Sequence, residues 1–172
     1  MKIIIIGAGP AGISAAETLR KFDTTIDITL FSRESYPPYS PPAMIEYFLS
    51  GKEAHLWRWK DIAKRLNINF RPDTRVIDIM PEKHSLRLSH GETCQYDKLL
   101  VATGSRLSTT VNGSDKKGIY NLKSFFHAKK LYDTVCEKQV KEVIVIGAGF
   151  IGVEIALLLS HLKLKVNLLE MT

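Results

Sequence analysis

Two stretches of the chain carry unbroken runs of apolar, mostly β-branched residues, and glycines follow each run at once. The first run is Ile3–Ile6 in "IIIIGAGPAG", and the second is Val143–Ile146 in "VIVIGAGFIG". An apolar run without alternation is typical of a parallel strand that is buried on both faces. After the first run, apolar residues recur at helical spacing up to Arg20, and Ile26–Phe31 then alternates as a second strand. The pattern predicts two βαβ units, the second beginning near Glu142.

The segment between these units has a different pattern. Prolines crowd Ser35–Met44, which excludes a helix interior or a central strand and predicts a stiff loop. A helix is expected over Trp57–Leu66, and short strands separated by turns follow between residues 76 and 104, as in an antiparallel meander. Apolar positions at i, i+3, i+4 and i+7 in Ala128–Val135 predict another amphipathic helix, with Ser124 as its N-cap.

The glycines after each apolar run have the G-x-G-x-x-G spacing of dinucleotide-binding turns. The first glycine permits a tight turn, the second lets a pyrophosphate approach the backbone, and the third lets helix and strand pack closely. Free N–H groups at the helix start then meet the phosphate charge. The spacing alone is weak evidence, but here each copy follows an apolar strand and opens a helix, which is the context the motif requires. The candidate residues are Gly7, Gly9, Gly12, Gly147, Gly149 and Gly152.

The predicted fold class is therefore α/β, with two Rossmann-like dinucleotide-binding units, an antiparallel β-meander in the first and an incomplete second unit. Ribose recognition is expected to differ between them. Glu170 ends the strand "KVNLLE", where a carboxylate can accept both ribose hydroxyls and repel a 2′-phosphate, favouring NADH over NADPH. The corresponding strand of the first unit ends at Ser32, with Arg33 and Glu34 just beyond. Ser32 or Glu34 can bond the ribose, and a solvated loop is the alternative for Arg33 and Glu34.

Composition narrows the choice of function. The net charge is +6 with scattered Lys and Arg, which favours a solvated basic surface over a nucleic-acid patch. Cys94 and Cys136 are far apart, so a disulfide framework or a zinc site has no support and a reducing cytoplasm is expected. No apolar stretch approaches membrane-spanning length, and the histidines show no metal-ligand spacing. The stretch "HLWRWK" (His55–Lys60) can stack on bases or a flavin, although packing of a loop against a helix is the favoured interpretation.

Four segments in this order resemble a known family. They are "IIIIGAGPAG", "PPYSPP", "YDKLLVATGSRL" and "EVIVIGAGFIGVEIA". Together they are similar to the FAD/NAD(P)-binding pyridine nucleotide-disulfide oxidoreductases, nearest the rubredoxin and ferredoxin reductase, NADH oxidase and nitrite reductase group. The resemblance implies FAD at the first glycine motif, NADH at the second, and hydride transfer between them. Electrons would then pass to a small electron-transfer protein or to oxygen.

The resemblance also assigns roles to individual residues. Pro10 and Ala11 would line the FAD pyrophosphate with the first three glycines, and the backbone of Val76 would face the adenine. Glu154 would project toward flavin and nicotinamide, and four residues would lie near the flavin cofactor: Ala102, Thr103, Gly104 and Arg106. Plain structural roles are the alternatives: a strand residue for Val76, a turn for Thr103 and Gly104, and a surface helix residue for Glu154.

The chain also departs from that family. Members that reduce disulfides or peroxides carry a redox cysteine in the loop matched by Tyr39–Met44, and Pro41 and Pro42 stand there instead. Thiol chemistry needs a thiolate, so we reject it and assign no catalytic side chain. The cofactors would carry the chemistry, while the protein aligns them.

Family chains are longer, so the sequence resembles a chain truncated at its C-terminus. The expected parts are an FAD-binding domain over residues 1–108, a linker and crossover helix over 109–140, and the start of an NAD(P)-binding domain over 141–172. An uncovered apolar sheet face near Glu170 would favour a homodimer through the C-terminal half. Two hypotheses follow: an FAD-dependent NADH oxidoreductase, or a non-catalytic nucleotide-binding or dimerising remnant of one.

Overall fold

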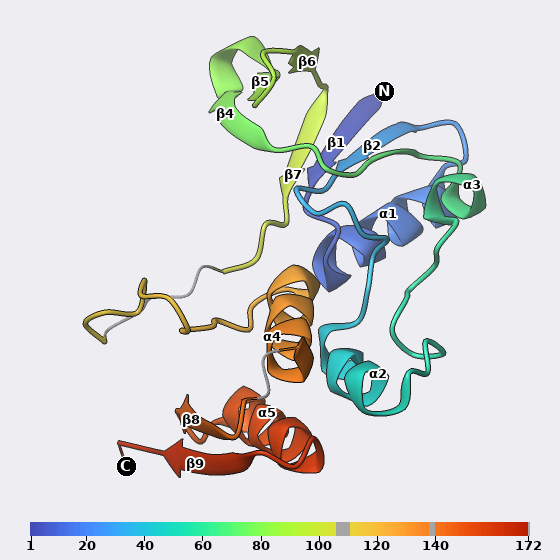
Figure 1. The fold of residues 1–172 in the computed structure, drawn as a ribbon. Helices are drawn as coiled ribbons and strands as arrows, with labels where there is room; N and C mark the ends of the chain where they lie inside the picture. Colours follow the sequence, from blue (N-terminus) through green and yellow to red (C-terminus); the bar gives the residue numbers. More distant parts are fainter. Residues whose placement is uncertain (106–110, 138–139, 172) are drawn as a thin grey trace. The chain divides into compact units, whose positions relative to one another are not determined.

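The computed structural model describes residues 1–105, 111–137 and 140–171 (Figure 1). The chain divides into two compact units. The first contains Met1–Ser40 and Trp57–Ser105, and the second contains Pro41–Leu56 with the described part of residues 106–172. Residues 41–56 thus group with the C-terminal part of the chain, although they lie within the FAD-binding domain that the sequence predicts. Arg106 lies outside the described residues.

The first unit is built on a parallel sheet of four strands in the order β3-β2-β1-β7. The central strand, β1 (Lys2–Ile6), pairs with β2 (Asp27–Phe31) and β7 (Lys98–Val101), while β3 (Asn69–Arg71) is an edge strand. Both faces of β1 are buried, as its apolar run predicts. The α/β class with a parallel sheet is therefore confirmed.

The two faces of β1 pack against different layers (Figure 1). Ile3 and Ile5 pack with Ile13 and Ala16 of α1 (Pro10–Phe22). Ile4 and Ile6 pack with residues of an antiparallel sheet of three strands: β4 (Val76–Met80), β5 (Ser85–Leu88) and β6 (Thr93–Gln95). A short 3₁₀ turn, η2 (Pro81–Lys83), joins β4 to β5. The alternation along one strand thus fixes a helix on one side of the parallel sheet and a second sheet on the other.

The predicted helix over residues 57–66 is wrong at its start, because α3 covers only Ile62–Leu66. The N–H group of Arg58 donates to the carbonyl of Pro38 at 2.8 Å, and Trp57 forms an isolated β-bridge with Tyr39. These pairings hold residues 57 and 58 in an extended conformation, so the helix cannot begin there.

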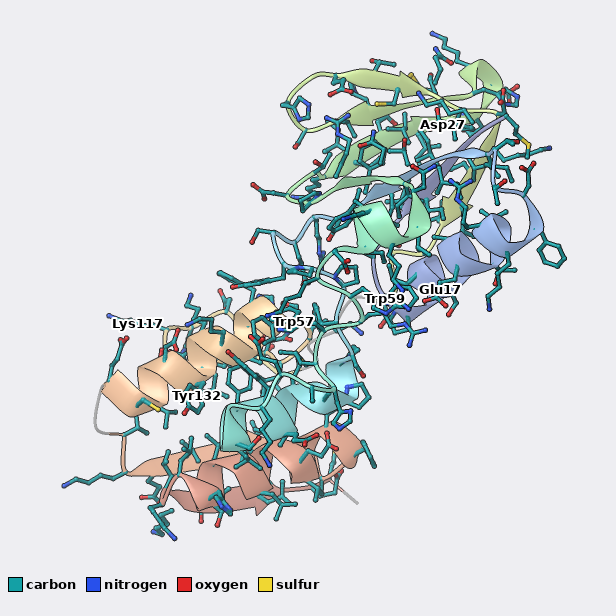
Figure 2. The ribbon with its side chains drawn as sticks, turned by 90° about the vertical axis from the view of Figure 1, so that its right-hand side faces the viewer. Glu17, Asp27, Trp57, Trp59, Lys117 and Tyr132 are labelled. Carbon is teal, nitrogen blue, oxygen red and sulfur yellow. The ribbon has the colours of Figure 1, made fainter. Side chains whose placement is uncertain are left out.

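The aromatic and basic stretch around these tryptophans has a packing role in the first unit (Trp57, Trp59 and Glu17 are labelled in Figure 2). Trp59 packs against the core that includes the buried face of α1, and the guanidinium groups of Arg58 and Arg65 lie 4.8 and 4.2 Å from its ring centroid. Arg58 also pairs with Glu17 of α1 at 3.0 Å. The favoured interpretation of this stretch, loop packing against a helix, agrees with these contacts.

The second unit contains a parallel pair of strands, β8 (Glu142–Ile146) and β9 (Lys165–Leu169). Its helices are α2 (Met44–Ser50), which follows the 3₁₀ turn η1 (Pro41–Ala43), α4 (Phe125–Glu137) and α5 (Phe150–His161). Ser124 directly precedes α4, and its hydroxyl accepts the N–H of His127 at 3.4 Å, which confirms the predicted N-cap.

One face of this strand pair packs and the other lies open to solvent. Val143, Val145 and Val166 pack against a core formed by α4 and α5. Ile144 and Ile146 point the other way and are 64% and 68% exposed. Such exposure of neighbouring large apolar side chains is unusual on the surface of a monomeric protein. Among the described residues, no helix has the length and apolar character needed to cross a membrane.

Candidate functional site

The first glycine-rich turn joins β1 to α1 and is shaped by close backbone contacts. Gly7 has a φ of 112°, and its N–H donates to the carbonyl of Phe31 at the end of β2 at 2.8 Å. A Cβ on Gly12 would overlap the carbonyl oxygen of Gly7, so helix and strand approach too closely for any side chain. A Cβ on Gly9, in contrast, would meet no atom of the described residues within 4 Å. The turn is therefore tightly packed at Gly12 and open over Gly9.

The second turn, between β8 and α5, repeats this geometry. Gly147 has a φ of 101°, and its N–H donates to Leu169 at the end of β9 at 2.8 Å. A Cβ on Gly152 would overlap the carbonyl oxygen of Gly147, whereas a Cβ on Gly149 would meet no described atom within 4 Å. The helix-opening bonds also agree, because Ile13 donates to Gly9 and Val153 donates to Gly149, both at 3.0 Å. Each unit therefore contains the same strand-turn-helix element.

Neither of these helices begins with an acidic residue. The first turn of α1 holds Pro10 and Ala11, both exposed, and the first turn of α5 begins with Phe150. Unpaired N–H groups and the helix dipole leave partial positive charge at such a terminus. Because neither helix has an acidic residue in its own first turn, each N-terminus can take an anionic group over its open glycine.

The end of β2 is fixed by the chain segment that follows β3. Ser32 is buried, its N–H donates to Arg71 at 3.0 Å, and its carbonyl accepts the N–H of Thr74 at 2.7 Å. The Ser32 hydroxyl accepts the N–H of Glu34 at 3.1 Å, while Arg33 is exposed. The structure thus places the Ser32 side chain in a local turn. Thr74 belongs to this cluster, and no motif in the sequence identified it.

Val76 follows Thr74 by two residues and opens β4. Its side chain is partly buried against the cluster that contains Ile4, Phe31 and Leu88. The structure therefore gives the side chain of Val76 a packing role and brings its strand close to the end of β2. A contact of its backbone with adenine remains a prediction.

The chain leaving β7 packs directly on the first turn. The N–H of Ala102 donates to the carbonyl of Ile6 at 2.8 Å, and a Cβ on Gly7 would overlap the Ala102 carbonyl oxygen. Thr103 and Gly104 are exposed just beyond, and Gly104 has a φ of 69°. The structure thus brings together two motifs that lie far apart in the sequence. Gly104 takes a left-handed conformation that suits glycine.

Glu170 lies against the second turn. One carboxylate oxygen accepts the N–H of Ala148, inside the glycine motif, and the other accepts the N–H of Met171 at 2.8 Å. These backbone hydrogen bonds, that from Ala148 above all, lower the pKa of Glu170 below its ordinary value of 4.5. An exposed carboxylate is therefore held in its charged form beside the glycine turn. Glu154 lies in the second turn of α5 and is partly buried.

The remaining candidate chemistry is sparse. Cys94 is buried and Cys136 is exposed, and both are free thiols. Within the described ranges, no group of three or more His, Cys, Asp or Glu side chains is arranged to hold a metal ion. The first unit offers a backbone turn and the polar groups around Ser32, and the second unit offers a backbone turn and one carboxylate.

Comparison with known proteins gives consistent matches along the chain. The family model described as pyridine nucleotide-disulphide oxidoreductase matches residues 1–172. The chain is 34% identical to the 3-phenylpropionate/cinnamic acid dioxygenase ferredoxin-NAD(+) reductase component of Photorhabdus laumondii, over 97% of this chain and 43% of that protein. It is 33% identical to the rubredoxin-NAD(+) reductase of Pseudomonas putida, over 99% of this chain and 45% of that protein.

A solved structure agrees with these matches. The crystal structure of NADH:rubredoxin oxidoreductase from Clostridium acetobutylicum superposes with a TM-score of 0.85 at 30% identity. The superposition covers 99% of this chain and 44% of that one. The chain therefore spans less than half the length of these proteins.

Proposed function

This chain belongs to the pyridine nucleotide-disulphide oxidoreductase family, as its motifs predict, and we propose that it forms part of an FAD-dependent NADH oxidoreductase. When bound, the two cofactors would supply hydride transfer from NADH to FAD, and the electrons would pass on to a small electron-transfer protein or to oxygen. The similar proteins named as ferredoxin and rubredoxin reductases support this choice. Because the chain spans less than half of them, the activity of a whole protein is part of the proposal.

The observation that carries the proposal is the repeated glycine turn. Gly9 and Gly149 each leave open space above a helix start, while Gly12 and Gly152 close the packing behind it. A diphosphate suits such a turn, since its charge would meet backbone N–H groups and the open glycine carries no side chain at the point of approach. One turn in each unit supports one dinucleotide for each unit, and a pair of dinucleotides suits electron transfer between a nicotinamide and a flavin.

We assign FAD to the first unit and NADH to the second. In the first, the turn from Gly7 to Gly12 would hold the pyrophosphate, with Ala102, Thr103 and Gly104 alongside. Ser32, Arg33 and Val76 would meet the adenosine end, although the buried Ser32 hydroxyl already accepts the N–H of Glu34. In the second unit, Glu170 would bind the adenosine ribose and Glu154 would face the flavin and nicotinamide.

The domain assignment follows from these roles. Residues 1–108 would supply the FAD site, residues 109–140 a linker and crossover helix, and residues 141–172 the first βαβ unit of an incomplete NAD(P)-binding domain. The second parallel strand pair, with its own glycine turn and carboxylate, supports this division.

Flavin absorbance tests the proposal directly. We expect the purified chain to take up FAD and show flavin absorbance, because the first unit contains the whole turn and its supporting sheet. Under anaerobic conditions, NADH should then bleach that absorbance. A chain that stays colourless after incubation with FAD and gel filtration would contradict the proposed function.

The second candidate is a non-catalytic, dimerising nucleotide-binding protein, which the exposed face of β8 favours. Ile144 and Ile146 lie two residues apart in β8, so they share one face of the strand, and both are exposed. If this face pairs with a second copy, light scattering after size exclusion should give twice the chain mass. Replacing Ile146 by lysine should return the chain to a monomer, whereas a wild-type monomer at all concentrations would rule out the dimer.

A further inference from the structure

Arg71 makes a bidentate ion pair across two sheets of the first unit. It is the last residue of the edge strand β3, and its two terminal nitrogens donate to the two carboxylate oxygens of Glu92 at 2.6 and 2.8 Å. Glu92 lies between β5 and β6, so the pair joins the parallel sheet to the antiparallel one. A two-point bond of this kind fixes orientation as well as distance, which a single contact does not.

The same guanidinium also covers the end of β2. It lies 5.4 Å from the ring centroid of Phe31, which is the last residue of β2 and only 1% exposed. The Arg71 side chain is itself only 28% exposed. A cation held over an aromatic face in partial burial adds to the ion pair. The Arg71 guanidinium therefore packs over the Phe31 ring, and the ion pair with Glu92 fixes the guanidinium in that position.

The backbone around these side chains leads directly to the glycine turn. The carbonyl of Arg71 accepts the N–H of Ser32, and the carbonyl of Phe31 accepts the N–H of Gly7, at 3.0 and 2.8 Å. Ser32 in turn accepts the N–H of Thr74 at 2.7 Å. The residues that Arg71 contacts are thus the ones that place the first glycine and the end of β2.

Two further contacts hold Glu92 in place. The Nε2 of His90 lies 3.0 Å from one carboxylate oxygen, and the thiol of Cys94 donates to the other at 3.3 Å. The hydrogen bonds from Arg71 above all, with those from His90 and Cys94, keep the pKa of Glu92 far below its ordinary range. The pair is therefore charged on both sides at neutral pH.

We propose that Arg71 is a positioning residue for the flavin site, and that it fixes the end of β2 and the first glycine turn through Phe31 and Glu92. The identity of the ligand rests on the proposed function, but the effect on the protein backbone does not. The class of ligand affected is an adenosine diphosphate group, because in the proposed function the glycine turn would bind its diphosphate and the end of β2 its adenosine.

A matched control lies in the neighbouring sheet. Arg87 donates one hydrogen bond to Asp78 at 3.0 Å, and the two side chains are 51% and 44% exposed. This pair joins the adjacent strands β4 and β5, and within the described part of the chain neither side chain hydrogen-bonds to β2. Arg87→Gln therefore removes an arginine ion pair from the same unit without disturbing the end of β2.

Amide hydrogen exchange of the labelled chain, measured by NMR, tests the positioning role without any ligand. In Arg71→Gln we expect the amides of Gly7 and Ser32 to exchange at least about tenfold faster. The amide of Asp27, which donates to Met1 at the opposite end of β2, should change little (Asp27 is labelled in Figure 2). Arg87→Gln should leave all three near wild type. Unchanged exchange at Gly7 and Ser32 would overturn the proposal, whatever the chain binds.

Titration with FAD and with ADP then tests the consequence for binding. Arg71→Gln and Glu92→Gln should each raise both dissociation constants about tenfold, and the double variant should add little, since the residues act as one pair. Arg71→Lys should fall between, because lysine keeps the charge and loses the fork. Wild-type affinity in Arg71→Gln would contradict the proposal. A wild-type chain that binds neither ligand would defeat the proposed function, while amide exchange would still decide the role of Arg71.

Discussion

Replacing Gly9 by alanine is expected to lower the affinity of the chain for FAD by about 10- to 100-fold while leaving the first unit nearly as stable as before. Gly9 has φ and ψ values of −75° and −179°, which alanine adopts without strain. The added methyl group would meet no atom in the described part of the chain within 4 Å. It would instead occupy the space through which a diphosphate must approach the backbone.

The size of this effect follows from the bonds at risk. A hydrogen bond to a charged group contributes about 1.5–3 kcal/mol, and loss of one such bond corresponds to about 10- to 100-fold in affinity. Flavin fluorescence titration measures the affinity, and urea unfolding followed by circular dichroism measures the stability. Removing a glycine from a helix N-cap should change the free energy of unfolding by less than about 1 kcal/mol.

Two further variants make this result specific. Gly149→Ala places the same methyl group on the second turn, so it should weaken NADH binding and leave the FAD affinity unchanged. Gly12→Ala should instead destabilise the fold, because its Cβ would overlap the carbonyl oxygen of Gly7. If Gly9→Ala binds FAD as tightly as the wild type does, the diphosphate does not lie over the first turn.

The parts of the fold that sequence predicts well are those fixed by local patterns. The apolar run Ile3–Ile6, the glycines that follow and the alternation of Ile26–Phe31 locate β1, the first turn and β2 within a residue or two. The edge strand β3 was missed because three residues are too few to show a period. The late start of α3 could not be predicted either, since it depends on Arg58 pairing with the distant Pro38.

The candidate site shows the same division. Spacing, together with the apolar strand before each motif and the helix after it, identified the six glycines and Glu170, because the geometry they require is local to one βαβ unit. The approach of Ala102 to Gly7 depends on how β7 pairs with β1. The pairing of Arg71 with Glu92 depends on how the two sheets of the first unit pack together. In the sequence, a charged residue at either position cannot be told from an ordinary surface residue. Such tertiary contacts leave no periodic signal.

Glu170→Gln is expected to reduce the preference of the chain for NADH over NADPH by about tenfold or more. The Glu170 carboxylate accepts the N–H groups of Ala148 and Met171 and has lone pairs left for two ribose hydroxyls. A glutamine side chain offers a single acceptor oxygen and no charge. NADH should therefore bind less tightly, while the 2′-phosphate of NADPH no longer meets a repelling carboxylate. Dissociation constants for both coenzymes, measured by calorimetry, give the ratio.

Glu142→Gln is the matched control for this prediction. Glu142 lies in the same unit at the opposite end of the strand pair, where it bonds Lys165 and Asn167, and it should leave the coenzyme ratio unchanged. The affinity of the wild type for NADH should also hold from pH 8 to pH 5. Hydrogen bonds keep the pKa of Glu170 below 4.5, so the carboxylate stays charged throughout that range and gains a proton only as the pH falls further. An affinity for NADH that is lost above pH 5 would show that a group other than Glu170 controls NADH binding. A coenzyme preference that survives in Glu170→Gln would show that another group discriminates between the two coenzymes.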